Sequence, residues 1–439
     1  MQKVVKFGGS SLASAKQFKK VKSIILSDSS RHYVIPSAPG KRHNRDTKVT
    51  DMLYACYAQA AAGDDFSQTL KEIRERYEKI IDGLSLAFSL DQEFQEIEKN
   101  FRNKEGKDYA ASRGEYLNGR ILAAYLDFAF VDAANVICFT EKGTLDAEKT
   151  NASLASVLAE YPYAVIPGFY GSMPDGSIHT FSRGGSDITG SLVARAIHAN
   201  LYENWTDVSG FLIADPRIIE NPEVIDTITY RELRELSYMG ATVLHEEAIF
   251  PVRKEGIPIN IRNTNAPEDK GTMIVQDTIK VPKYTITGIA GKENFVSLHV
   301  EKAMMNEEIG YGRRVLQVLE DNGISFEHMP SGIDTLSVCV RQEAFEQHEQ
   351  EVIAGIHRAV SPDLIELEAG IALIAVVGRG MKEIRGTAGR IFSALAHANV
   401  NVKMIDQGSS ELNMIIGVKN EEFHRAVKAI YDIFVTTQL

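Results

Sequence analysis

The chain has 439 residues, about three times a typical domain length, so two or three separate cores are expected. Hydrophobic residues make up 44% and charged residues 24% of the chain, which is ordinary globular usage and excludes collagen-like and disordered classes. The net charge of -11 repels phosphate backbones and anionic bilayers, so neither nucleic acid nor a membrane is an expected partner.

The compartment can be inferred from the cysteines and the apolar runs. Cys56, Cys138 and Cys339 are far apart and lack metal-ligand spacing, so no disulfide framework and no protein-held metal site is expected. Apolar runs such as residues 371–377 are far shorter than the roughly 20 residues that span a bilayer. The first residues lack the pattern of a secretion signal. We expect a cytoplasmic protein.

The first 200 residues alternate short β-branched runs with long helical ones, which predicts a mostly parallel sheet covered by helices. Strands are predicted over residues 3–7, 33–37, 135–139, 163–166, 257–262 and 273–275. Helices are predicted over residues 18–26, 50–62, 66–84, 110–131 and 191–199. This first domain is expected to cover residues 1–280.

The last third of the chain contains an internal duplication with an offset of 76 residues. Gly310 matches Gly386, residues 324–326 match 400–402, and residues 336–340 match 412–416. Each copy reads as strand, glycine turn, helix, strand, turn and strand, which predicts repeats over 285–360 and 361–439. The alternative is one α+β domain whose halves match by chance.

A glycine-rich turn follows the first predicted strand. Lys6 ends the strand, Gly8 and Gly9 let the backbone turn, and the hydroxyl of Ser10 follows before a helix begins. Backbone N–H groups and a cation at such a junction suit an anion such as phosphate. An ordinary β-α turn would look the same.

A second glycine pair strengthens the case for anion binding. Arg183 precedes Gly184 and Gly185, and Ser186 and Asp187 follow. The arginine fork suits a carboxylate or phosphate. Asp187 could instead be a helix N-cap, although a plain cap does not explain the Arg-Gly-Gly before it.

Two further segments carry charges near predicted element ends. Thr206 and Asp207 end a strand and are followed by Asp215 and Arg217, a pattern that suits a nucleotide but also a turn. Glu115 falls early in the helical run over 110–131, just before residues 116–131, where its carboxylate could simply favour the helix dipole.

Together these motifs resemble the aspartate kinases of the amino acid kinase superfamily, and the duplicated segment resembles paired ACT domains. The resemblance implies a three-layer sandwich around a mainly parallel sheet, followed by two βαββαβ-like ACT repeats. It implies ATP-dependent phosphorylation of the side-chain carboxylate of L-aspartate, with Mg²⁺ and ATP as cofactors. Other readings are a catalytically silent amino-acid sensor and a kinase for glutamate or acetylglutamate.

The resemblance also assigns roles to individual residues. Lys6, Gly8, Gly9 and Asp187 are implied as the catalytic group. Substrate contacts are implied for Thr50, Glu115, Arg183 and Ser186, with Glu115 on the ammonium and Arg183 on the α-carboxylate. ATP contacts are implied for Lys6, Ser10, Thr206, Asp207 and Arg217. Leu212 and Asn265 depart from the family pattern near the nucleotide, since some members have Tyr and Lys there.

The repeats are expected to control the kinase. An amino-acid effector, lysine in the first place and threonine or methionine otherwise, is expected to bind at the first repeat. The residues implied for this site are Met305, Glu308, Tyr311, Ser325, Glu327 and Ser331, some of which could equally be solvated loop residues. Exposed sheet edges favour a homodimer formed through the repeats.

Overall fold

The computed structural model describes residues 1–182, 184–241, 244, 246–278 and 282–437. Arg183 and the predicted domain end near residue 280 lie outside these ranges. The chain forms two compact units. The N-terminal unit comprises Met1–Phe211, Val224–Tyr230 and Val243–Thr278, and the C-terminal unit comprises Leu212–Glu223, Arg231–Thr242 and Ile279–Leu439. Within the described ranges, no helix is long and apolar enough to cross a membrane.

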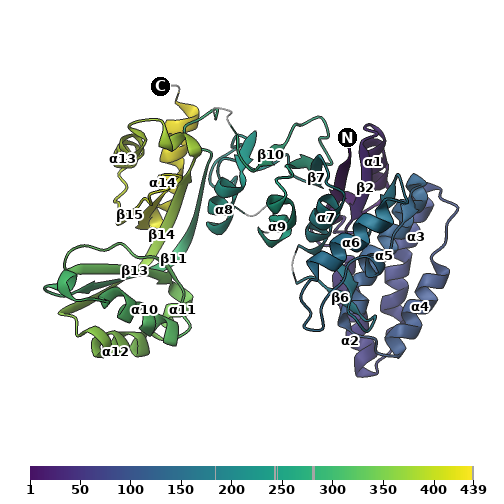
Figure 1. Cartoon of the computed structure of the whole chain (residues 1–439), viewed down its shortest axis with the longest axis horizontal. Coiled ribbons are helices and arrows are strands. Elements are labelled where there is room, and N and C mark those ends of the chain that lie inside the picture. The colour runs from purple at the N-terminus through teal and green to yellow at the C-terminus, as the bar shows by residue number, and fades with distance from the viewer. Residues whose placement is uncertain (183, 242–243, 245, 279–281, 438–439) are drawn as a thin grey trace. The chain divides into compact units, whose positions relative to one another are not determined.

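The N-terminal unit is built on a sheet with the order β3-β4-β2-β1-β7-β9-β10-β8 (Figure 1). All its pairings are parallel except β9 with β10, which confirms the predicted mainly parallel sheet. Its strands are β1 (Lys3–Phe7), β2 (Arg31–Pro36), β3 (Ala129–Phe130), β4 (Ala164–Val165), β7 (Leu201–Thr206), β8 (Thr227–Thr229), β9 (Ile259–Asn263) and β10 (Thr272–Val275). Strand β1 is central because Val4, Val5 and Phe7 are fully buried there.

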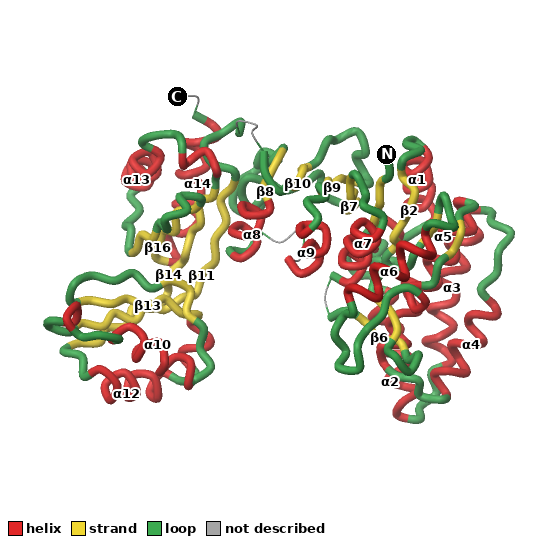
Figure 2. Tube along the Cα trace, viewed as in Figure 1, coloured by secondary structure: helices red, strands yellow, loops and turns green. Residues whose placement is uncertain are grey.

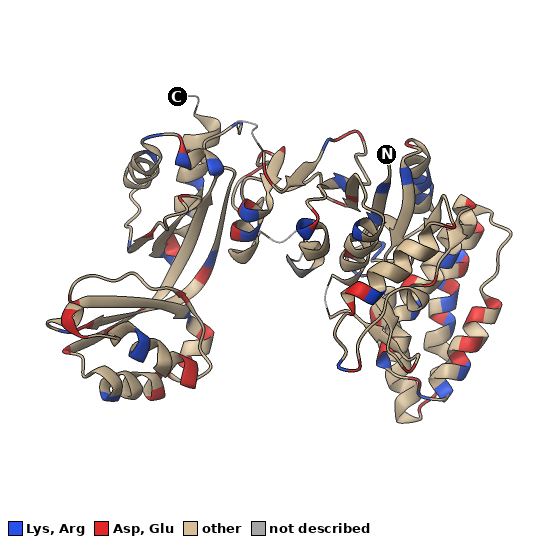
Figure 3. Cartoon of the chain, viewed as in Figure 1, with Lys and Arg blue, Asp and Glu red and all other residues tan. Residues whose placement is uncertain are grey.

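Helices surround this sheet. They are α1 (Ala15–Leu26), α2 (Val49–Ala62), α3 (Ser67–Leu84), α4 (Asp91–Arg102), α5 (Lys107–Leu126), α6 (Ala147–Leu158), α7 (Gly185–Ala196) and α9 (Glu246–Lys254). A small hairpin, β5 (Tyr170–Ser172) and β6 (Ile178–Thr180), precedes α7. Buried side chains of α1 to α5, among them Phe18, Leu53, Tyr77 and Phe101, join the core of the sheet. Acidic and basic side chains are interspersed along α3 and α4 (Figure 3).

Three predicted elements of this unit are wrong in extent or type. The strand predicted over 135–139 is a short 3-10 helix, Ala133–Asn135, followed by single β-bridges at Cys138 and Phe139. The helix predicted to reach residue 131 ends at Leu126, because Asp127 adopts a left-handed conformation with φ 58°. The helix predicted to begin at Ser191 begins at Gly185, after Gly184 with φ 58°.

The C-terminal unit contains a second sheet, with the order β12-β13-β11-β14-β16-β15. Its strands are β11 (Gly288–Glu301), β12 (Phe326–His328), β13 (Thr335–Arg341), β14 (Leu364–Val377), β15 (Met404–Asp406) and β16 (Asn413–Lys419). Its helices are α10 (Tyr311–Asp321), α11 (Gln342–Glu346), α12 (Glu349–Val360), α13 (Thr387–His397) and α14 (Phe423–Tyr431), together with most of α8 (Tyr230–Tyr238). Figure 2 shows the long strands β11 and β14 side by side.

The two repeats share these long strands. Residues 295–301 of β11 pair with β13 and with the first half of β14, while residues 288–292 pair with residues 373–377 of β14. A register shift between Lys292 and Phe295 separates the two halves of β11. The first repeat is therefore a βαββαβ unit with its own core, and the second takes the start of β11 as an additional strand.

The offset between the repeats changes partway along. Strands β11 and β14, and helices α10 and α13, begin 76 residues apart, as predicted. Ile324 and Val400 also correspond, since each donates its backbone N–H to a leucine carbonyl five residues earlier. Strands β12 and β15, and β13 and β16, begin 78 residues apart. The predicted match of 336–340 with 412–416 is therefore wrong by two residues, because the second copy has two extra residues between Val400 and Met404.

Candidate active site

The two glycine-rich turns of the N-terminal unit meet at an ion pair. Lys6 Nζ on β1 lies 2.6 Å from Asp187 Oδ1 on α7. Lys6 is 8% exposed, so this charge pair is largely shielded from water. Asp187 lies inside the first turn of α7, after the N-cap Gly184, and its carboxylate makes no capping bond. The N-cap interpretation of Asp187 is therefore wrong.

The backbone around Gly8 and Gly9 is fixed by close packing. Gly8 N–H donates to the carbonyl of Trp205, and Gly40 N–H donates to the carbonyl of Gly9. A Cβ on Gly9 would lie 2.8 Å from the Ala38 carbonyl oxygen, so only glycine fits there. A Cβ on Gly8 would lie 3.8 Å from Lys6 Nζ. Glycine at position 8 therefore leaves the space beside the ammonium open to an anion.

Glu115 is a buried carboxylate in the middle of α5, which begins two turns earlier at Lys107. The helix-dipole interpretation is therefore wrong. The residue is 6% exposed, and its Oε2 has no hydrogen-bond partner within the described ranges. Burial raises the pKa of Glu115 to about 8, against the opposing effect of the Ala38 backbone N–H that it accepts. An uncompensated buried carboxylate is a ready site for a cationic ligand group.

Helix α5 approaches α2 closely at Gly114. A Cβ on Gly114 would lie 2.8 Å from the Ala38 Cβ and 3.8 Å from Thr50 Oγ1. Thr50 on α2 therefore lies close to the residue before Glu115. Ser186 is buried beside Gly168, where a Cβ would lie 2.6 Å from the Ser186 side chain. Arg183, the fourth predicted substrate contact, lies outside the described residues.

The predicted ATP contacts fall into two groups. Ser10 follows β1, Thr206 ends β7 and Asp207 follows it, so all three lie at the carboxyl edge of neighbouring parallel strands. Thr206 Oγ1 donates to Asp207 Oδ1 at 3.2 Å. Arg217 belongs to the C-terminal unit, where its exposed guanidinium pairs with Asp215 at 2.5 Å. Leu212 is half-buried in that same unit.

Two residues that were not predicted from the sequence, Lys20 and Asn204, contact residues that were. Lys20 of α1 donates to Asn265 Oδ1 at 2.8 Å, which places an ammonium group beside Asn265. Asn204 of β7 donates to Asp187 Oδ1 at 2.7 Å. A polar side chain within a buried central strand was the available signal for Asn204.

The residues predicted to bind the effector fall into two groups, one near α10 and one on β12 and its flanking turns. Met305 and Tyr311 are buried beside α10, and Glu308 pairs with Lys302 at 2.6 Å and with Arg314. Glu327 on β12 accepts from Arg341 Nε at 2.9 Å and from the Tyr238 hydroxyl of α8 at 2.6 Å. Ser325 and Ser331 are exposed in the flanking turns.

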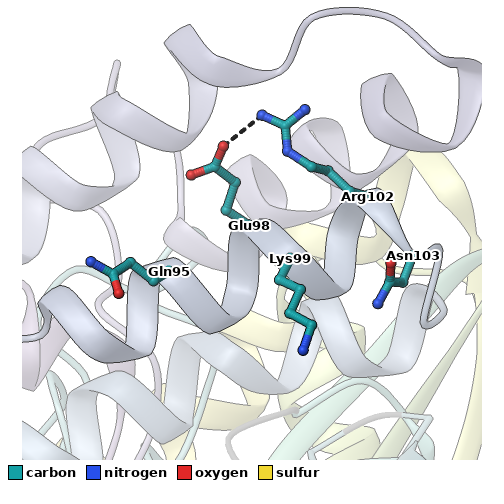
Figure 4. Close-up of a pocket in the computed structure, with 5 residues that line it drawn as sticks. All are labelled: Gln95, Glu98, Lys99, Arg102 and Asn103. Atoms are coloured by element: carbon teal, nitrogen blue, oxygen red, sulfur yellow. Dashed lines mark hydrogen bonds and ion pairs between the residues drawn. The ribbon is translucent and has the colours of Figure 1, made fainter.

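A groove on the outer surface of α4 has no such features (Figure 4). It is lined by Gln95, Glu98, Lys99, Arg102 and Asn103. Glu98 and Arg102 satisfy each other at 2.6 Å. These side chains all come from one helix, so the groove lacks the converging elements of a catalytic site.

Comparison with known proteins identifies the family of this chain. Residues 1–263 match the amino acid kinase family, and residues 374–434 match an ACT domain. Aspartokinase 3 of Bacillus subtilis is 41% identical, over 98% of this chain and 98% of the relative.

Two solved structures share the fold. The crystal structure of Clostridium acetobutylicum aspartate kinase has a TM-score of 0.90 at 52% identity and covers 98% of this chain and 99% of that one. Escherichia coli aspartokinase III in complex with aspartate and ADP has a TM-score of 0.72 at 24% identity, covers 99% of both chains, and matches in fold. The chain therefore belongs to the aspartokinase family of amino acid kinases that carry C-terminal ACT domains.

Proposed function

We propose that this protein transfers the γ-phosphoryl group of ATP to the side-chain carboxylate of L-aspartate, forming 4-phospho-aspartate. The observation that carries the proposal is the Lys6–Asp187 pair at 2.6 Å, which joins the two glycine turns at one point. This reaction would be the first step of lysine, threonine and methionine biosynthesis.

The proposed chemistry needs no general base. An aspartate side chain with a pKa near 3.9 is already a carboxylate at pH 7, so it can attack phosphorus directly. Catalysis then rests on in-line placement and on neutralising charge at the phosphoryl oxygens. Lys6 and the backbone N–H groups after Gly8 and Gly9 would supply that neutralisation, while Asp187 holds the Lys6 ammonium in place.

Substrate recognition would use the buried carboxylate of Glu115. Glu115 would take the ammonium of aspartate on its unpartnered Oε2, which would relieve an otherwise unpaired buried carboxylate. Thr50 on α2 and Ser186 on α7 would contact the carboxylates of the substrate. Arg183 would bind the α-carboxylate, an assignment that rests on the family motif.

ATP would lie along the carboxyl ends of β1 and β7. Ser10, Thr206 and Asp207 would line this edge, and Arg217 is the remaining family contact. Mg²⁺ would accompany ATP on its phosphate oxygens and neutralise part of their charge. Among the described residues, no group of three or more His, Cys, Asp or Glu side chains is placed to hold a metal ion.

The first repeat would bind the amino-acid effector near the N-terminus of α10. Glu308 pairs there with Lys302 and with Arg314, and a basic effector would bind by displacing one of these two cations. Tyr311 and Met305 would form its apolar wall, and Ser325, Glu327 and Ser331 its far side. An effector inhibits only if it binds one state of the enzyme better than another.

Assembly and location are further parts of the proposal. The edge strands β12 and β15 carry the exposed apolar side chains Phe326 and Ile405, which favours a homodimer through the repeats. Sedimentation equilibrium should give a dimer mass, and Ile405→Lys should shift the protein toward monomer. The three cysteines are free, as suits a reducing cytoplasm.

A substrate comparison tests the central proposal. Purified protein is assayed for ADP formation with aspartate, glutamate and acetylglutamate in parallel, with and without lysine or threonine at millimolar levels. Aspartate should be the only good acceptor, and lysine should lower the rate. Turnover with none of the acceptors would favour a silent sensor, and a preference for glutamate or acetylglutamate would favour another amino acid kinase.

A further inference from the structure

Asn204 is placed to control the catalytic pair. It lies on β7 directly beside Lys6 of β1 in the parallel register, so both side chains project from the same face of the sheet. The residue is 2% exposed. Its Nδ2 donates to Asp187 Oδ1 at 2.7 Å, and its Oδ1 lies 3.5 Å from Lys6 Nζ. One side chain therefore touches both members of the pair.

Strand β7 holds Asp187 at two points. Asn204 binds the carboxylate, and Tyr202, two residues earlier on the same face, donates its hydroxyl to the Asp187 carbonyl at 3.3 Å. Helix α7 can approach this closely because Gly190 packs against the Tyr202 ring. The first turn of α7 is thereby fixed to the central sheet through backbone and side chain together.

The Asn204 amide donates a hydrogen bond to Asp187 without adding a charge. A single carboxylate, that of Asp187, therefore faces the Lys6 ammonium at this point. Asp187 Oδ1 then accepts from Lys6 and from Asn204 together, which restricts rotation of the carboxylate. With an apolar residue at this position, the contact to Lys6 alone would leave the carboxylate free to turn.

We propose that Asn204 is a positioning residue for phosphoryl transfer, which orients the Asp187 carboxylate and through it directs the Lys6 ammonium toward the phosphoryl group. This inference rests on the proposed function of the Lys6–Asp187 pair. A misplacement of about 1 Å can cost 10²-fold in rate, so a residue that sets this angle affects kcat without touching the substrate.

The first test compares Asn204→Leu with a matched control. Tyr33→Phe removes a buried hydroxyl on β2 of the same sheet, which donates to the Leu158 carbonyl at 2.9 Å and lies 3.2 Å from the Tyr161 carbonyl. Asn204→Leu should lower kcat by about 10- to 100-fold, with the KM for aspartate changed less than about threefold. Tyr33→Phe should leave kcat within about twofold. If Asn204→Leu keeps wild-type kcat, or if its loss lies wholly in KM, the proposal is wrong.

The second test uses Asn204→Asp, which retains the size and shape of the side chain. The introduced carboxyl group faces Lys6 of β1, Asp187 of α7 and the Tyr202 phenol of its own strand. When protonated it can donate to Asp187 as the amide does, and when ionised it repels Asp187. Its kcat relative to wild type should therefore rise as pH falls from 9 to 6, while the ratio for Asn204→Leu stays flat. Equal pH profiles for the two variants would overturn the proposal.

Two further variants test the proposed catalytic pair, Lys6 and Asp187, separately from the proposed role of Asn204. Lys6→Met and Asp187→Asn should both lose most of kcat. If they do while Asn204→Leu and Asn204→Asp behave as wild type, only the role of Asn204 fails. If Lys6→Met and Asp187→Asn retain activity, the proposed catalytic pair itself is wrong. Circular dichroism and thermal melts of each variant show whether the fold is retained, and Asn204→Asp provides the answer should Asn204→Leu not fold.

Discussion

Two of the buried ion pairs, Lys6–Asp187 in the N-terminal unit and Glu232–Arg379 in the C-terminal unit, are engaged to different degrees. In the N-terminal unit, Lys6 makes one short contact to Asp187 and a longer one to Asn204. In the C-terminal unit, Glu232 of α8 is fully buried and accepts from the Thr287 hydroxyl at 2.5 Å and from the Arg379 backbone and guanidinium at 2.9 Å. Both oxygens of Glu232 are engaged.

The difference indicates different uses of buried charge. The ammonium group of a lysine has three hydrogen-bond donors. The glycine turn leaves space beside the Lys6 ammonium, so this cation can still bind an anion. In the other pair, Glu232 bonds to Arg379 and to Thr287. Such internal bonding is expected of a contact that attaches helix α8 to the second repeat. Loss of the first pair should therefore change rate, and loss of the second should change stability.

The largest expected effect is on the rate. Lys6→Met should lower kcat by more than about 10³-fold, because charge on the phosphoryl oxygens loses its side-chain cation. The matched control is Lys3→Met, at the other end of β1, where Lys3 pairs with Asp28 at 2.7 Å. Steady-state kinetics should show kcat within about twofold of wild type for the control. Similar losses for both variants would show that the effect is not specific to Lys6.

The second prediction concerns the attachment of α8. Glu232→Gln should destabilise the C-terminal unit by about 3–5 kcal/mol, because Arg379 is left beside a neutral group in a buried site. Hydrogen exchange followed by mass spectrometry should show faster exchange in peptides around Thr287 and Arg379 than in peptides of β1. Glu98→Gln on the surface of α4 serves as the control and should leave exchange unchanged.

The third prediction tests the buried carboxylate of Glu115, whose Oε2 has no hydrogen-bond partner among the described residues. Glu115→Gln should raise the KM for aspartate by about 10²-fold with a smaller change in kcat. In the wild type, the KM should fall as pH rises toward 8, since the ammonium requires the ionised form of a group with a pKa of about 8. The variant should show no such slope. A slope of equal size in both proteins would assign the titration to another group.

The same raised pKa predicts a stability effect without substrate. Because the folded pKa lies above the ordinary value of 4.5, the contribution of Glu115 is full below pH 4.5 and is lost as pH rises through about 8. Urea unfolding of the free enzyme should show this decline across pH 5 to 8. Glu115→Gln should remove that part of the pH dependence.

The smallest effect is expected at an exposed pair. His328 Nδ1 of β12 lies 2.8 Å from Asp406 Oδ2 of β15, and the Asp406 side chain is 41% exposed. Asp406→Asn should cost about 0.5 kcal/mol in urea unfolding at low salt, because water and ions screen such pairs. A loss comparable with that of Glu232→Gln would show that burial does not decide the strength of these contacts.

The sequence predicted the features that depend on neighbouring residues. The first strand, its glycine turn and the helices over 50–62 and 66–84 follow from local pattern, and the structure confirms them within a residue or two. The strand over 135–139 failed because an apolar run of that length fits a short bridge region as well as a strand. The start of α7 was misplaced because Gly184 and Gly185 suggested a loop rather than a cap and first helical residue.

Features that depend on distant residues could not be read in the same way. Asn204 meets Lys6 across 198 positions only because β7 pairs with β1 in one particular register. Glu232 and Arg379 lie 147 residues apart and meet through the second repeat. Burial turned Glu115 from a residue beside a supposed helix start into an unpaired carboxylate in mid-helix. Each of these contacts arises from tertiary packing.

The path of the chain limits how the C-terminal unit can be removed from the protein. Leu212–Glu223 and most of α8 belong to the C-terminal unit, although both lie before Thr278. Leu233 and Leu236 of α8 and Met239 just after it are buried, and Leu236 lies against Gly288 at the start of β11. A truncation after residue 278 would leave these side chains uncovered and prone to aggregation. An unregulated enzyme is therefore better sought by point substitution than by cutting off the carboxyl-terminal third.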